Sequence, residues 1–260
     1  MNAFPVRSAH PGPTIEAGVA NASFVAQARF DGWIAFTSWP HADVEALLPA
    51  ELELVPSVRT PGEHPVAFIL GEQTDCAVLI GGFPVPTGAR YHEVGMMVPF
   101  VKHRQGRHVH IYVPRMYASY FPAVWSGNLN FGFAKQLATI SRHGHVLLVT
   151  GEGGVPLLEA DVEAAGDWLP GASCRLENFD AMRAAFALPV VGRRNDGTLV
   201  CSYFGWGFAD TFVRAGDSCI VIHQPLVPGL APQRRPDVPS GSFEVRGLLW
   251  QLSWPAPCRF

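Results

Sequence analysis

The sequence predicts an α+β fold made mainly of antiparallel β-strands, in which a closed, barrel-like sheet carries a few flanking helices. Three observations lead to this fold class. Short apolar runs of strand length recur along the chain, 26 glycines and 23 prolines are spread throughout it, and segments with helical periodicity are few. Frequent glycine and proline divide a chain into short elements joined by turns, which is typical of barrels and sandwiches.

Six expected strands are apolar runs or apolar–polar alternations of strand length. They span residues 33–36, 66–70, 108–113, 146–149, 220–222 and 243–254. Asp196-Gly197 is expected to form a hairpin turn between Val190-Val191 and Leu199-Val200, because both turn positions tolerate positive φ.

The expected helices are short. Residues 43–48 place their apolar side chains on one face, and Pro49 ends the segment. Asn178 is expected to cap a second helix, with Phe179 and Phe186 on its apolar stripe.

No break in composition divides the chain, so we expect an N-terminal arm over residues 1–25 and a single domain over residues 26–260. The proline-rich residues 225–239 are expected to form a surface loop, and residues 114–125 a helix disturbed at Pro122. The N-terminus lacks a charged segment followed by an apolar one, so it does not resemble a signal peptide.

Charge and cysteine content argue against several classes of protein. A formal net charge of −3 gives no basic surface for nucleic acid, and no apolar stretch approaches the ~20 residues that span a bilayer. The five cysteines are widely spaced, which argues against a disulfide framework and a structural zinc site. We therefore expect mostly buried, reduced cysteines and a cytoplasmic protein.

Lysine is unusually rare, since only two of the 19 basic residues are lysines, Lys102 and Lys135. This chain uses arginine at nearly every basic position. A lysine that remains is therefore expected at a position where arginine cannot do the same task. Lys102 lies in a polar segment typical of a hairpin tip and is expected at the surface. Lys135 follows the apolar residues 131–134 and needs another explanation.

An unprotonated lysine amine can attack a carbonyl group and form a Schiff base. A free lysine has a pKa of ~10.4 and is almost fully protonated at neutral pH, but removal from water favours the neutral amine. Phe131, Phe133 and Leu137 could provide an apolar environment if they surround Lys135. The alternative is a lysine at the end of an element, with its stem on apolar surface and its head in water.

Two other groups could carry chemistry. Glu93 could act as a general acid or base if it and Tyr91 share one face of a strand; the alternative is an exposed carboxylate at a strand end. His108 and His110 share one face of a strand, a pattern that can bind a metal, but no carboxylate follows them closely. Two outward-facing polar residues are the simpler interpretation, and we expect no metal site.

Four segments have the order and spacing of a known family. Residues 127–138 read Gly-Asn-Leu-Asn-Phe-Gly-Phe-Ala-Lys-Gln-Leu-Ala, residues 91–93 read Tyr-His-Glu, residues 44–53 join a short helix to Pro-Ala-Glu-Leu-Glu, and Asp196-Gly197 marks a hairpin. With these segments the chain resembles the acetoacetate decarboxylase family from about Arg29 onward. In that family, a lysine in the first segment forms the Schiff base, and the glutamate of a Tyr-x-Glu motif lies in the active site.

The resemblance implies catalytic roles for Lys135 and Glu93. The residues that it implies as substrate contacts are Arg29, Tyr91, Phe131, Phe133 and Gln136. It also implies an antiparallel barrel-like fold, a homo-oligomer, no cofactor, and a small keto acid or other carbonyl compound as substrate. The function that follows most directly is a Schiff-base lyase, a β-keto acid decarboxylase. The alternatives are a Schiff-base aldolase or dehydratase of the same superfamily and a non-catalytic barrel that binds small ligands.

The chain departs from the family pattern at two points. The family's Arg-Glu pair after the first glycine is Asn128-Leu129 here, which removes two charges, and its second lysine is Gln136. Because residue 136 carries no charge, it cannot activate Lys135 as a neighbouring cation, and burial must favour the neutral amine instead.

Overall fold

The computed structural model describes residues 22–56, 61–227 and 230–258. Its strands are β1 (Phe24–Pro40), β2 (Leu52–Leu54), β3 (Glu63–Ile80), β4 (Phe83–Pro86), β5 (Tyr91–His103), β6 (Val109–Ala118), β7 (Lys135–Leu137), β8 (Thr139–His143), β9 (Val146–Thr150), β10 (Pro156–Pro170), β11 (Val190–Arg193), β12 (Leu199–Ser202), β13 (Phe204–Gly207), β14 (Phe212–Ile222), β15 (Gln233–Ser253) and β16 (Ala256–Pro257). Its helices are α1 (His41–Glu45), α2 (Phe121–Ser126) and α3 (Phe179–Phe186), with a π-helix η2 (Gly127–Phe131) and 3₁₀ turns η3 (Glu152–Gly154) and η4 (Gly171–Ser173).

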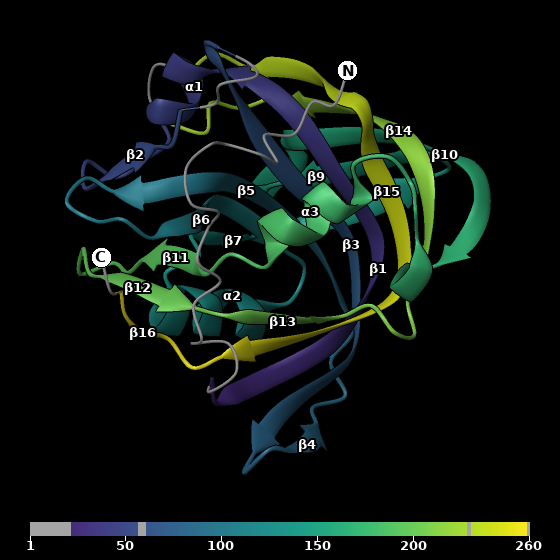
Figure 1. The fold of residues 1–260 in the computed structure, drawn as a ribbon, viewed down its shortest axis with the longest axis horizontal. Helices are drawn as coiled ribbons and strands as arrows, with labels where there is room; N and C mark the ends of the chain where they lie inside the picture. The colour runs from purple at the N-terminus through teal and green to yellow at the C-terminus, as the bar shows by residue number, and fades with distance from the viewer. Residues whose placement is uncertain (1–21, 57–60, 228–229, 259–260) are drawn as a thin grey trace.

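All of these strands belong to one large, curved sheet, and α3 lies in front of it (Figure 1). The main path runs β16-β12-β11-β6-β5-β3-β1-β15-β14-β10-β9-β8, while β2, β4, β7 and β13 pair beside it. The expected antiparallel character is confirmed; β6 pairs in parallel with β7 and β11. The expected closure of the sheet is wrong, because β8 and β16 end the path without meeting. Apolar alternation reports which faces of a strand are buried, and it does not report whether the outermost strands meet.

The core lies on both faces of the sheet. Along β3, Phe68 and Leu70 belong to one apolar cluster, while Ala67 and Ile69 belong to a second. Successive side chains of a strand point to opposite faces, so the two clusters lie on opposite sides of the sheet. Burial on both faces explains why residues 66–70 form a continuous apolar run.

Helix α3 covers the second cluster, and its apolar stripe packs as expected. Phe186 contacts Phe36 edge to face at 6.1 Å, and Phe179 contacts Phe243 at 5.5 Å between ring centroids. Asn178 occupies the expected N-cap position, but its side chain does not cap the helix. Asn178 has φ 63, and its side-chain amide donates to the carbonyl of Pro239 at 3.1 Å instead.

Two other local expectations need correction. Residues 114–118 continue strand β6, and α2 begins only at Phe121, with Pro122 in its first turn. Proline fits there because the first N–H groups of a helix have no partner inside it. Within the proline-rich residues 225–239, β15 begins at Gln233, so only the first part of that segment is a loop.

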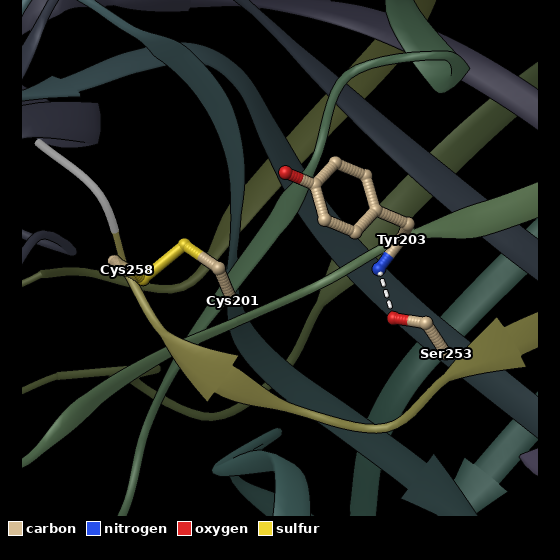
Figure 2. Close-up of a disulfide and its surroundings, with 4 residues drawn as sticks. All are labelled: Cys201, Tyr203, Ser253 and Cys258. Atoms are coloured by element: carbon tan, nitrogen blue, oxygen red, sulfur yellow. Dashed lines mark hydrogen bonds between the residues drawn. A yellow bond between two sulfur atoms is a disulfide. The ribbon is translucent and has the colours of Figure 1, made fainter. Parts of the chain in front are cut away.

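Cys201 and Cys258 form a disulfide, contrary to the expectation of unpaired cysteines (Figure 2). The two residues are 57 positions apart in the sequence, but β12 and β16 pair beside each other, with Cys201 opposite Ala256. Figure 2 also shows the N–H of Tyr203, which lies between β12 and β13, donating to Oγ of Ser253, the last residue of β15. Spacing in the sequence could not reveal this pair, because strand pairing creates the proximity.

The expected N-terminal arm, residues 1–25, lies mostly outside the described residues, and the single domain over residues 26–260 stays a prediction. In the described part of the chain, each helix is too short or too polar to cross a membrane.

Candidate active site

Lys135 begins the short strand β7, opposite Met116 of β6, and its side chain is 9% exposed. The side-chain amide of Asn128 forms hydrogen bonds with both the backbone N–H and the backbone carbonyl of Lys135. Oδ1 of Asn128 accepts the N–H of Lys135 at 2.6 Å, and Nδ2 donates to the Lys135 carbonyl at 2.8 Å. Two such hydrogen bonds contribute about 1–3 kcal/mol. Asn128, at a position where the family has arginine, therefore fixes the backbone that carries the amine.

The backbone before Lys135 requires small residues. A Cβ atom on Gly127 would lie 2.7 Å from Cδ and 2.8 Å from Cε of Lys135, so glycine leaves room for the lysine stem. Gly132 ends η2 in the left-handed region at φ 65, which glycine adopts without strain. Ala134 has φ 43, which is uncommon for alanine. Strained backbone of this kind is concentrated at functional sites.

Glu93 lies on β5, between β3 and β6, and is 5% exposed. Its Oε2 atom lies 2.5 Å from Nζ of Lys135. The opposite charges of the two groups offset each other. Without its partner, either buried charge would be strongly destabilising. A carboxylate at this distance can accept a proton from the amine and return it later.

Gln73 and Trp250 extend this ion pair into a hydrogen-bonded chain. The indole N–H of Trp250 donates to Oε1 of Gln73 at 2.7 Å, and Nε2 of Gln73 donates to Oε1 of Glu93 at 3.4 Å. Sequence reasoning missed both residues. The available signal was the spacing, because Gln73 lies four residues after Ile69 and shares its face if the expected strand continues. In the structure, β3 does continue, and Gln73 is 2% exposed.

These side chains line a cavity of about 60 Å³, together with Tyr91. The rest of the lining is apolar or aromatic and consists of Phe30, Ile34, Ile69, Met97, Val113, Met116, Phe133, Val190, Phe204, Trp206, Trp250 and Leu252. Most of these residues belong to the second apolar cluster. The amine–carboxylate pair thus lies in a low-dielectric environment, where electrostatic interactions are strong.

A larger hollow of about 380 Å³ lies elsewhere, against Glu63, Arg234 and Asp237. Volume alone favours that hollow. We assign the site to the smaller cavity because a buried amine and carboxylate in contact are a recognised catalytic arrangement, whereas volume by itself carries no chemistry.

Tyr91 lines the cavity and stacks on Tyr120, with ring centroids 5.6 Å apart. Burial, and after it the nearby Glu93 carboxylate, raise the pKa of Tyr91 well above its ordinary value. The phenol therefore keeps its proton at physiological pH and can donate a hydrogen bond to an oxygen atom in the cavity.

The structure brings together some of the expected site residues and separates others. Phe133 lines the cavity beside Lys135, Glu93 and Tyr91, and Phe131 stacks behind it at 5.4 Å. Gln136 follows Lys135 on β7 and is exposed.

Arg29 lies outside the cavity lining. Its Nη1 donates to the carbonyl of Gly247 at 3.1 Å, and its Nε lies 3.7 Å from Asp75. Its assignment as a substrate contact stays a prediction.

The two histidines expected to face outward differ in exposure. His108 precedes β6 and is partly exposed, whereas His110 is 3% exposed, so the expectation is wrong for His110. The reason is that β6 contributes side chains to both apolar clusters and is covered on both faces. Across the described ranges, no three His, Cys, Asp or Glu residues are placed to hold a metal ion.

The sequence family of acetoacetate decarboxylase (ADC) matches residues 12–204 of the chain. No curated protein matches the chain closely in sequence. In structure, the chain is similar to acetoacetate decarboxylase from Legionella pneumophila subsp. pneumophila str. Philadelphia 1, with 15% identity, coverage of 92% of this chain and 88% of that chain, and a TM-score of 0.58.

Two further solved structures have the same fold. An acetoacetate decarboxylase-like enzyme from Sphingomonas wittichii RW1 is 15% identical, with coverage of 91% and 94% and a TM-score of 0.57. The enduracididine biosynthesis enzyme MppR, complexed with the condensation product of pyruvate and imidazole 4-carboxaldehyde, is 12% identical, with coverage of 88% and 87% and a TM-score of 0.55.

Proposed function

Since the chain belongs to the acetoacetate decarboxylase family, we propose that it is a lyase in which Lys135 forms a Schiff base with a small carbonyl substrate. The observation that carries the proposal is the contact of 2.5 Å between Nζ of Lys135 and Oε2 of Glu93 inside an apolar cavity.

The reaction begins with transfer of a proton from the Lys135 ammonium to Glu93, which leaves a neutral amine. The amine attacks the carbonyl carbon and gives a carbinolamine. Glu93 returns the proton to the hydroxyl group, water leaves, and a protonated imine forms. The Tyr91 phenol can donate to the oxygen atom while negative charge develops on it.

The protonated imine accepts electrons from a neighbouring bond. In a β-keto acid, the bond to the carboxylate breaks, carbon dioxide leaves, and the electron pair forms an enamine. In an aldolase, the bond to a hydroxyl-bearing carbon breaks instead, and an aldehyde leaves. In both cases the enamine takes up a proton, and hydrolysis restores Lys135.

Decarboxylation is the reaction that the sequence resemblance favours, and the family match supports it. Aldol-type chemistry is supported by the fold shared with MppR, whose complex contains a condensation product of pyruvate. The Schiff base is common to both reactions, so it is the step to test first.

Exchange of the carbonyl oxygen tests this step without knowledge of the final product. A ketone labelled with ¹⁸O loses its label to water each time an imine forms and hydrolyses. We expect the wild-type protein to accelerate label loss from acetone or pyruvate, and Lys135→Arg to abolish the acceleration, because a guanidinium is always charged and cannot attack.

Lys102→Arg is the matched control, since it alters the other lysine of the chain. It is expected to exchange oxygen at the wild-type rate. Exchange by Lys135→Arg at the wild-type rate would rule out the proposed nucleophile. Absence of exchange in the wild-type protein would favour a non-catalytic barrel that binds small ligands.

A further inference from the structure

The charged groups that line the cavity limit the charge that a substrate can carry. Lys135 is the cationic residue among the described residues that line it, and its amine is already paired with the carboxylate of Glu93. The pair is neutral as a whole. The other polar lining residues, Gln73 and Tyr91, are uncharged, and the remaining walls are apolar or aromatic.

We infer that the carbonyl compound accepted at Lys135 carries no carboxylate and is a short, uncharged ketone or aldehyde. The inference rests on the proposed Schiff base and specifies its substrate class. A substrate carboxylate would add a second negative charge beside Glu93, in a cavity where the one cation from the described residues is already paired. Buried charges are costly unless they are paired, so the neutral compound binds better.

Formation of the imine preserves this balance for a neutral substrate. The protonated imine has the same charge as the lysine ammonium that it replaces, and Glu93 stays in contact with it. With a keto acid, the cavity would carry a net charge of −1 at every stage, whether the proton lies on Lys135 or on Glu93. Arg29, the expected partner for a carboxylate, instead faces Asp75 and the carbonyl of Gly247.

The size of the cavity limits the length of the substrate. Its volume is about 60 Å³, whereas a dry cavity of ~150 Å³ is known to hold benzene. By this comparison, the cavity as it stands holds about two or three heavy atoms, so a longer ketone requires some movement of the walls and short substrates are favoured.

The substrate class also selects between the two reactions. A compound without a carboxylate cannot lose carbon dioxide, so the imine must act in aldol-type chemistry. In the cleavage direction, Glu93 takes the proton of the β-hydroxyl group of the bound substrate, the carbon–carbon bond breaks, and an aldehyde leaves. The electron pair of that bond forms the enamine, and Glu93 returns the proton to its carbon before hydrolysis.

Butanone and pyruvate form a pair for the test, because they differ only where an ethyl group replaces a carboxylate, which has one more heavy atom. The rate of adduct formation on Lys135 is measured in cyanoborohydride with each ketone. Each rate is divided by the rate at which the same ketone forms an adduct with free n-butylamine under the same conditions. This division corrects for the greater intrinsic reactivity of pyruvate. We expect the corrected rate to be at least tenfold higher with butanone. In Glu93→Gln, which removes the competing charge, we expect this preference to fall severalfold.

A corrected preference for pyruvate would overturn the inference and leave the Schiff base intact. Absence of an adduct with either ketone would overturn both. An unchanged preference in Glu93→Gln would overturn the charge-based reason for the discrimination.

Discussion

Gly127 lies directly against the stem of Lys135, and a Cβ atom on residue 127 would lie 2.7 Å from Cδ of the lysine. Gly127 has φ −61 and ψ −43, which alanine adopts readily. Gly127→Ala should therefore keep the backbone and push the amine away from Glu93. Because a displacement of about 1 Å can cost a hundredfold in rate, we expect adduct formation at Lys135 to slow about tenfold to a hundredfold.

Gly151→Ala is the matched control for this substitution, since its Cβ would meet only the flexible end of Leu157, at 3.2 Å. It is expected to react at the wild-type rate. A Gly127→Ala protein that reacts as fast as wild type would show that the stem of Lys135 is not held at this contact.

Glu93→Gln should slow adduct formation by about a hundredfold to ten-thousandfold, the usual contribution of a general acid–base group. The glutamine keeps the size of the side chain but cannot carry the proton between amine and hydroxyl. Glu72→Gln is the control, because Glu72 lies on β3 and pairs with the exposed Arg90. Equal rates in the two variants, measured by mass spectrometry over time, would exclude Glu93 from the reaction.

His64 makes the stability of the protein sensitive to acid. Burial lowers the pKa of His64 to about 4, and its Nε2 lies 2.7 Å from the carbonyl of Pro99. In the unfolded chain, the histidine has a pKa of about 6.5. The contribution of the neutral ring to the free energy of unfolding is therefore complete above pH 6.5, and it is lost as the pH falls toward 4. At pH 4.5 the loss is about 2.5 kcal/mol.

His64→Gln should remove this part of the pH dependence, as measured by urea unfolding at pH 7 and pH 4.5. The exposed His143→Gln is the control and should keep the acid loss. If the wild-type protein and His64→Gln lose the same stability between the two pH values, the buried ring is not the cause.

The disulfide predicts a specific count of thiols. The unfolded, unreduced protein should expose three reactive thiols, Cys76, Cys174 and Cys219, and the reduced protein all five. The crosslink joins residues 57 positions apart, so Cys258→Ser should lower the free energy of unfolding by about 4 kcal/mol. Cys219→Ser should have a much smaller effect. Five reactive thiols before reduction would contradict the crosslink.

Lys135 and Glu93, the two central residues of the candidate site, were predicted from the resemblance to the family. Local chemistry alone left a lysine or glutamate at the end of an element as the simpler interpretation, and the order and spacing of the four segments reversed it. Gln73 and Trp250 were missed because an amide and an indole are common in cores, and only the pairing of β3 with β5 and the course of β15 bring them together. The sequence resemblance could not place Arg29, whose orientation depends on tertiary contacts with Asp75 and Gly247.

The class of fold was predictable from local patterns, since strands leave clear apolar alternations. Closure of the sheet and the Cys201–Cys258 bond were not, because both depend on contacts between distant segments. Disulfides are rare in reducing cytosol, so the bond removes the cysteine-based reason for a cytoplasmic location. That location and the homo-oligomer stay predictions.

Borohydride trapping followed by peptide mass spectrometry tests the central proposal most directly. The protein is incubated with butanone, acetoacetate or pyruvate, reduced, and digested. We expect a substrate-sized mass increase on the peptide that contains Lys135, and an unmodified peptide at Lys102. Modification of Lys102 alone, or of neither lysine with any carbonyl compound, would contradict the assignment of Lys135 as the Schiff-base nucleophile.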